Sequence, residues 1–130
     1  MQTINEKNYV DQAEKVIKAL IRVNPKSKKS ELKITTSKIR NILTLTMNVL
    51  NEVKEQRTEL LPDSIVSQIS YLRVRVMYEA GRDRDVNDFV REGKLVEILQ
   101  SIGNKKADFL LFSRYIEALV AFHKYYGGRD

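Results

Sequence analysis

The spacing of apolar residues constrains this chain more than any other feature, because it follows the period of an α-helix over most of the sequence. In the segment from Val10 to Ile21, apolar side chains recur every three or four positions, and four later segments repeat this spacing. Each such helix carries an apolar stripe that must be buried against other helices. Little of the sequence reads as strand. We therefore predict an all-α protein, a compact single-domain bundle of about five helices over residues 1–130.

Turn and capping residues indicate where these helices begin and end. Asn24-Pro25 should end the first helix, Gly81 the third and Gly127-Gly128 the last. Gly93 is a possible break within the fourth helix. The expected helices cover residues 5–23, the segment from the Thr35–Ser37 caps to Arg57, and residues 62–81, 85–101 and 105–126. We expect residues 1–34 to form a first helix followed by a basic linker, and residues 35–126 to form the rest of the bundle.

Positive charge is concentrated in that linker. The chain has 23 Lys and Arg against 17 Asp and Glu, a formal net charge of +6. From Arg22 to Arg40, seven bases oppose the single acid Glu31, which is seven minus one, or +6, so the other 16 bases and 16 acids cancel. The segment is a candidate contact for a polyanion or, alternatively, a solvated flexible loop.

The composition excludes several kinds of catalytic and metal site. One histidine and no cysteine rule out a thiolate or histidine-rich metal site within one chain, and no HExxH, phosphate-loop or GxGxxG pattern occurs. GRDRDVND differs from a calcium loop at Asp88 and Lys94, so Asp83 or Asp85 more plausibly caps the next helix. His123 should be packed or bonded to a carbonyl. We expect no enzymatic activity, no metal and no cofactor.

The expected compartment follows from what the sequence lacks. No apolar run approaches the ~20 residues that span a bilayer. Nothing near Met1 resembles a signal peptide, and the absence of cysteine suits a reducing environment. We expect a soluble, cytoplasmic protein that does not contact a membrane.

The third predicted helix has apolar residues on two faces. Arg73 and Met77 fall within its core stripe, whereas Tyr71, Val74 and Tyr78 lie on the opposite side. Tyrosine and arginine on an outer face are typical of a protein interface or a nucleic-acid platform. The alternative is a central helix that its own bundle buries on both sides.

The last predicted helix also has an unusually wide apolar arc, which includes Phe122. Such an arc indicates either burial against another chain or a central position in the bundle. The first of these explanations makes Phe122 a candidate interface residue.

Three segments, in order, resemble those of a known family. TTSKIRNI (35–42), YLRVRVMYEAGRD (71–83) and FSRYIEALVAFHKYY (112–126) are similar to the small subunit of the Csm effector complex of type III-A CRISPR systems. The resemblance covers roughly Thr35 to Tyr126. It implies an all-helical, non-catalytic subunit that stacks in several copies beside backbone subunits and a large polymerase-like subunit. It would explain the second apolar faces as a subunit interface, formed by Tyr71, Val74, Tyr78 and Phe122.

The resemblance also implies contact with the duplex of guide RNA and target RNA through backbone phosphates, while base pairing reads the sequence. Lys38 and Arg40 are the first candidates, because exposed N–H groups at a helix start favour anions. Arg75 and Arg82 on the outer face come next, although Arg82 also suits the C-terminal end of its helix. Lys54 extends the charge of the second helix.

Two other functions fit parts of the sequence. The third helix, the GRDRD turn and the fourth helix could form a helix-turn-helix of a DNA-binding regulator, but four acids against two bases make its recognition segment a poor fit to a major groove. A protein-interaction module that uses Tyr71, Tyr78 and Phe122 without nucleic acid is the other alternative.

Overall fold

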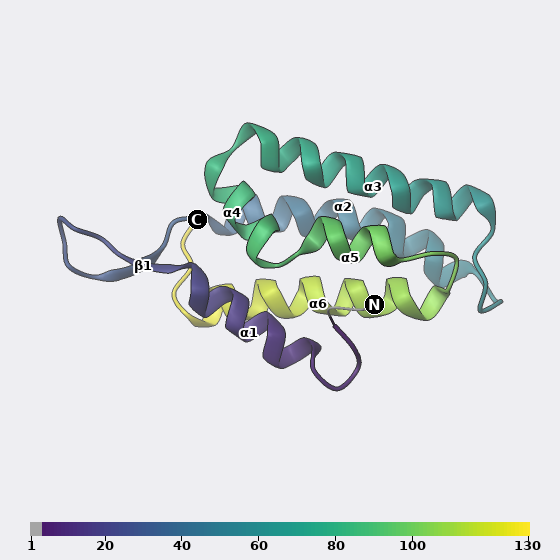
Figure 1. Cartoon of the computed structure of the whole chain (residues 1–130), viewed down its shortest axis with the longest axis horizontal. Coiled ribbons are helices and arrows are strands. Elements are labelled where there is room, and N and C mark those ends of the chain that lie inside the picture. The colour runs from purple at the N-terminus through teal and green to yellow at the C-terminus, as the bar shows by residue number, and fades with distance from the viewer. Residues whose placement is uncertain (1–3) are drawn as a thin grey trace.

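Six α-helices and one two-stranded hairpin make up residues 4–130, the part of the chain that the computed structural model describes (Figure 1). The all-α prediction is therefore confirmed, with one small hairpin added. The elements in chain order are α1 (Tyr9–Leu20), β1 (Ile21–Val23), β2 (Ser30–Leu32), α2 (Thr36–Glu55), α3 (Asp63–Arg82), α4 (Arg84–Glu92), α5 (Leu95–Ser101) and α6 (Lys106–Tyr125). No helix within this described range is long and apolar enough to cross a membrane.

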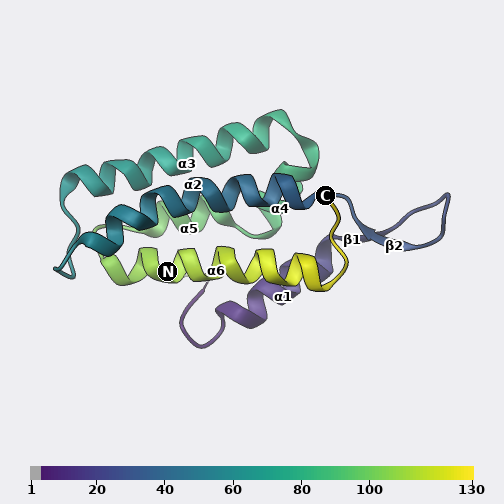
Figure 2. The same cartoon turned by 180° about the vertical axis from the view of Figure 1, so that it is seen from behind.

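Helix α6 is the centre of the bundle. It packs against α1 and α2, α2 packs on α3, and the short helices α4 and α5 also pack on α3 (Figures 1 and 2). Phe109, Phe112, Ile116 and Leu119 of α6 are completely buried, and the rings of Phe109 and Phe112 lie 6.0 Å apart. The wide apolar arc of the last helix is thus accounted for by a central position.

Two helix starts have the caps that the sequence indicates. The Thr35 hydroxyl accepts a hydrogen bond from the Lys38 N–H at 3.3 Å at the start of α2. The Asp83 carboxylate accepts from the N–H groups of Asp85 and Val86 at 2.9 and 3.1 Å at the start of α4. Because these oxygens satisfy backbone donors that the helix cannot, they determine where each helix begins.

The fourth predicted helix is two helices, α4 and α5, which are separated at Gly93 and Lys94. Lys94 adopts the left-handed conformation, with φ 55°. A side chain at position 93 would come within 3.1 Å of the Phe89 carbonyl, and the Tyr115 hydroxyl donates to the Gly93 carbonyl at 2.9 Å. The helix breaks at Gly93, as the sequence suggested, and a Cβ atom there would be in tight contact with the Phe89 carbonyl.

The prediction of a first helix over residues 5–23 is wrong at both ends. Helix α1 begins at Tyr9 and ends at Leu20, and Val10, which we expected in its buried stripe, is 45% exposed. Leu32 of the following hairpin is buried. Three-residue strands are too short to show a recognisable alternation, so the sequence pattern did not reveal the hairpin.

Candidate nucleic-acid and subunit interfaces

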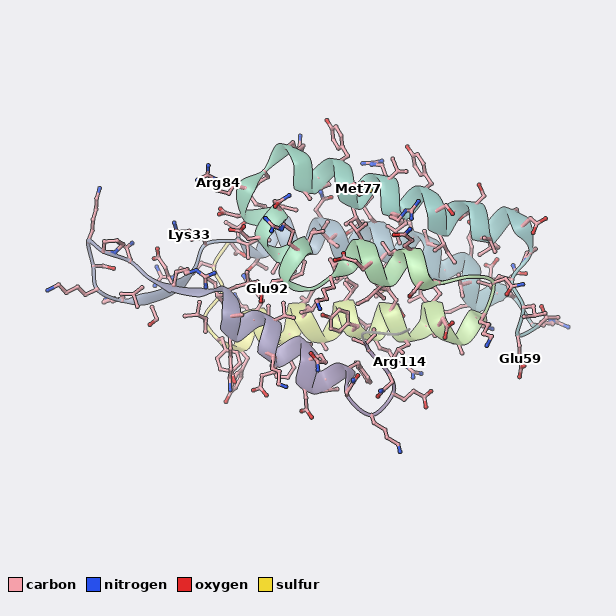
Figure 3. The ribbon with its side chains drawn as sticks, in the orientation of Figure 1. Lys33, Glu59, Met77, Arg84, Glu92 and Arg114 are labelled. Carbon is pink, nitrogen blue, oxygen red and sulfur yellow. The ribbon has the colours of Figure 1, made fainter. Side chains whose placement is uncertain are left out.

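Helix α3 exposes a row of large apolar side chains, which we call the apolar α3 face: Tyr71, Val74, Met77 and Tyr78. Between 52% and 60% of each side chain is accessible to solvent. Met77, which Figure 3 labels on α3, is among these exposed side chains. The bundle therefore does not bury α3 on both sides. Contiguous exposed apolar surface of this kind is typical of an interaction site.

The placement of Met77 corrects the sequence prediction, which put it in the core stripe. Ile69, Leu72 and Val76 form the buried side of α3, and Arg73 is half-buried at its edge. Met77 lies three residues after Val74 and therefore shares its face. This i, i+3 relationship was the signal that could have located Met77 from the sequence.

Phe122 does not lie with the apolar α3 face. It is partly buried against the core, and its ring stacks on Tyr126 at a centroid distance of 6.4 Å. The Tyr126 hydroxyl donates to Glu14 of α1. This hydrogen bond and burial raise the pKa of Tyr126 to about 12. Phe122 thus helps to join α6 to α1, whereas Tyr71, Val74 and Tyr78 face solvent together.

Lys38 and Arg82 lie near each other, where α2 begins and α3 ends, and each is paired with an acid. The Lys38 ammonium lies 2.7 Å from the Asp83 carboxylate, and the Arg82 guanidinium lies 3.2 Å from Glu79, which also accepts from Asn41. The hydrogen bond between Lys38 and Asp83 raises the pKa of Lys38 and lowers the pKa of Asp83. These five residues help to line a pocket of about 380 Å³. A phosphate that binds in this pocket would have to compete with the carboxylates of Asp83 and Glu79 for Lys38 and Arg82.

The N-terminus of α2 is less open to an anion than the sequence suggested. The Thr36 N–H donates to the Arg129 carbonyl at 2.7 Å, and the Lys38 N–H donates to the Thr35 hydroxyl. The C-terminal residues therefore lie over the first turn of α2 and take up one of its free donors. These two backbone donors are therefore occupied, and the Lys38 ammonium is itself paired with Asp83.

Arg40 and Lys54 form a second group, on the outer side of α2. Both side chains are exposed, and neither has an ion-pair partner among residues 4–130. They are 14 residues apart, so they share one helix face and lie roughly 21 Å apart along the axis at 1.5 Å per residue. This distance would allow separate contacts along one extended polyanion.

Arg75 lies apart from both groups, in a groove between α2 and α3 of about 430 Å³. Leu45 and Val49 of α2 line the groove together with Gln68 and Tyr71 of α3. Arg75 is half-buried and has no ion-pair partner in the described part of the chain. The structure therefore brings Lys38 and Arg82 together, leaves Arg40 and Lys54 separated along the outer side of α2, and places Arg75 beside the apolar α3 face.

Titratable groups elsewhere do not assemble a metal site. Across the described range, no group of three or more His, Cys, Asp or Glu side chains could hold a metal ion. The single histidine is buried, and the Nε2 atom of His123 lies 2.8 Å from the Ile34 carbonyl. His123 was expected to be packed or bonded to a carbonyl, and it is both.

We expect His123 to make stability depend on pH. Burial lowers its pKa below 6.5, although the Ile34 carbonyl opposes part of this shift. The unfolded chain therefore binds a proton more readily than the folded chain. Its contribution to the free energy of unfolding should be complete above about pH 6.5 and decrease at lower pH, by at most about 1.4 kcal/mol per pH unit for one proton.

Urea denaturation of the wild type and His123→Gln at about pH 7.5 and pH 5.5 would measure this effect. The loss of stability between the two pH values should be smaller in His123→Gln, because the carboxylates contribute equally to both proteins. An equal loss in the two proteins would contradict the assignment.

Comparison with known proteins connects this structure to one family. The family model described as Csm2 Type III-A matches residues 6–129. A Streptococcus thermophilus protein named CRISPR system Cms protein Csm2 is 37% identical over 130 residues, with complete coverage of both chains. A Mycobacterium tuberculosis protein of the same name is 38% identical over 128 residues, 98% of each chain. An Enterococcus italicus protein of that name is 36% identical over 96 residues, which cover 72% of this chain and 68% of the relative. The match extends through the N-terminal residues that the three motifs left unassigned, and the chain belongs to the Csm2 family of type III-A CRISPR systems.

Proposed function

We propose that this chain is a non-catalytic small subunit of a type III-A CRISPR effector complex in the cytoplasm. It stacks in several copies and contacts the duplex of guide RNA and target RNA through backbone phosphates. Its protein partners are copies of itself, the backbone subunits and the large polymerase-like subunit, and it needs no cofactor. The observation that carries this proposal is the match to the Csm2 family over residues 6–129.

The apolar α3 face supports the stacking part of the proposal. Tyr71, Val74, Met77 and Tyr78 are exposed in the single chain, and aromatic residues and methionine are enriched at protein interfaces. The Arg82 guanidinium lies 5.8 Å from the centroid of the Tyr78 ring, so a cation borders the apolar surface. A neighbouring subunit would bury this row.

The charge distribution supports the RNA part. Arg40, Lys54 and Arg75 have no carboxylate partner among the residues that the structure describes, so binding a phosphate would break no ion pair. Lys38 and Arg82 would first have to leave Asp83 and Glu79. We therefore rank Arg40, Lys54 and Arg75 above Lys38 and Arg82 as phosphate contacts. Lysine and arginine that contact phosphates bind nucleic acid with little dependence on sequence.

Replacing Arg40 and Lys54 by alanine should weaken target RNA binding by the reconstituted complex, mainly at low salt, where counterion release contributes most. Each phosphate contact that is removed should reduce the slope of log K against log salt concentration by about 0.7 to 0.9, because fewer counterions are released. Titration of labelled target RNA at several salt concentrations would measure the slope. Lys38→Ala should have a smaller effect, because Asp83 already neutralises this side chain.

Lys15→Ala and Lys124→Ala together are the matched control, since both side chains are exposed and lie on other helices. This double variant also loses two positive charges, and it should leave the salt slope unchanged. If the Arg40 and Lys54 variant has the wild-type slope, these residues do not contact RNA.

A further inference from the structure

The hairpin formed by β1 and β2 projects from one end of the bundle, beside the start of α2 (Figures 1 and 2). Its strands pair Ile21 with Leu32 and Val23 with Ser30. Because Leu32 is buried and Val23 is 64% exposed, the hairpin leaves the bundle within the length of one strand. At about 3.3 Å per residue, its turn lies roughly 15 Å beyond the last buried residue.

The turn of the hairpin has a defined conformation. The Asn24 N–H donates to the Lys29 carbonyl at 2.8 Å, and the Lys28 N–H donates to the Asn24 carbonyl at 2.7 Å. The Asn24 side chain accepts from the Lys26 N–H at 2.9 Å and donates to Glu31 at 3.0 Å. The backbone therefore holds three lysines, 26, 28 and 29, at the end of a structured projection; we call these residues the lysine tip.

Apart from Arg40, which lies on the outer side of α2, the bases of this region fall into two groups by their position relative to the acids of the bundle. Arg22 and Lys33, at the base of the hairpin, line a small pocket with Asp85 and Asp88, and Figure 3 shows Lys33 at that base. Lys38 is paired with Asp83. The side chains of the lysine tip, like those of Arg22 and Lys33, are exposed and form no ion pair within residues 4–130, but they lie at the opposite end of the hairpin from Asp85 and Asp88.

The chemistry of the lysine tip favours a phosphate backbone over a protein surface. Lysine is depleted at protein interfaces, where aromatic residues, methionine and arginine predominate. The turn from Asn24 to Lys29 contains no aromatic or aliphatic anchor other than Pro25. Lysine is a flexible point charge, which suits phosphate oxygens and carries no base specificity.

We propose that the lysine tip is a second phosphate-binding element, separate from Arg40 and Lys54, which contacts the RNA backbone beyond the reach of the helical bundle. This inference rests on the proposed function, because the RNA is that of the effector complex. It adds a contact that the helices alone would not make, and two linked contacts on one polyanion bind more strongly than either does separately.

The test is the triple variant Lys26→Gln, Lys28→Gln and Lys29→Gln in the reconstituted complex with guide RNA. Its control, Lys7→Gln, Lys15→Gln and Lys124→Gln, removes three other exposed lysines, so both variants have six minus three, or +3, net charge. The salt slope of target RNA binding should fall by about 2 for each copy of the tip variant that contacts the RNA and remain unchanged in the control. Between about 50 and 200 mM salt, the wild type should then lose roughly 16-fold more affinity than the tip variant for each such copy.

Three further results would decide the matter. Replacing the three tip lysines by arginine should restore the salt slope, because the positive charge returns. Equal slopes in the wild type and the tip variant would overturn the inference, while a reduced slope in the Arg40 and Lys54 variant would still support the proposed function. A tip variant that no longer enters the complex would also overturn it, because the tip would then contact a protein subunit.

Discussion

A chain with glutamate at positions 74 and 77 should fold normally but fail to enter the effector complex. Val74 and Met77 are 52% and 53% exposed, so their replacement should change the free energy of unfolding by no more than about 0.5 kcal/mol. Against a neighbouring subunit, the same two carboxylates would be buried without partners. Each would cost several kcal/mol, which exceeds the contribution of a typical interface residue.

Co-purification with tagged backbone subunits would measure incorporation, and thermal unfolding of the isolated variant would verify its fold. The control carries glutamate at positions 100 and 121, two exposed sites on α5 and α6. It has the same net charge and should assemble like the wild type. A complex containing the Val74→Glu, Met77→Glu chain at normal stoichiometry would show that the apolar α3 face is not the interface.

Gly128→Ala should lower the free energy of unfolding by about 1 to 3 kcal/mol, the usual cost of inserting atoms into a packed site. A Cβ atom at position 128 would lie far closer than 3.0 Å to three ring atoms of His123. The ring cannot move easily, because it is buried and bonded to the Ile34 carbonyl. Displacing the C-terminal residues instead would break the hydrogen bond from Thr36 to Arg129.

Gly103→Ala is the matched control, because a Cβ atom there meets nothing within 4 Å. Chemical denaturation should show a change of no more than about 0.5 kcal/mol for this variant. Equal stabilities of the two variants would mean that His123 and the C-terminal residues are not packed as the structure describes.

The helices and their caps could be predicted because the signals that specify them are local. An apolar stripe determines which side of a helix is buried, and Thr35 and Asp83 act on backbone groups two or three residues away. The same reasoning placed Tyr71, Val74 and Tyr78 on the outer side of α3. The same reasoning was wrong for Met77. We assigned it to the buried face because core residues lie near it in the sequence, whereas it shares the exposed face of Val74.

The candidate nucleic-acid contacts were less predictable because their electrostatic environment depends on residues that are distant in the sequence. Lys38 and Arg40 seemed equivalent in the motif TSKIRN. The structure places Asp83 beside Lys38 but leaves Arg40 without an acidic partner in the described part of the chain. No local pattern indicates that α2 begins where α3 ends.

The sequence by itself determined the helical class, the candidate caps of α2 and α4, the second apolar face of α3 with Tyr71, Val74 and Tyr78, and the family. Each depends on residue spacing along one helix or on short motifs that occur in a fixed order along the chain. Only the tertiary structure decided that α6 is central, that residues 21–32 form a projecting hairpin, and which positive charges remain unpaired. These properties depend on how elements distant in the sequence are arranged in space, which local periodicity does not specify. For the charges, a shift of a few ångströms decides whether an ion pair forms.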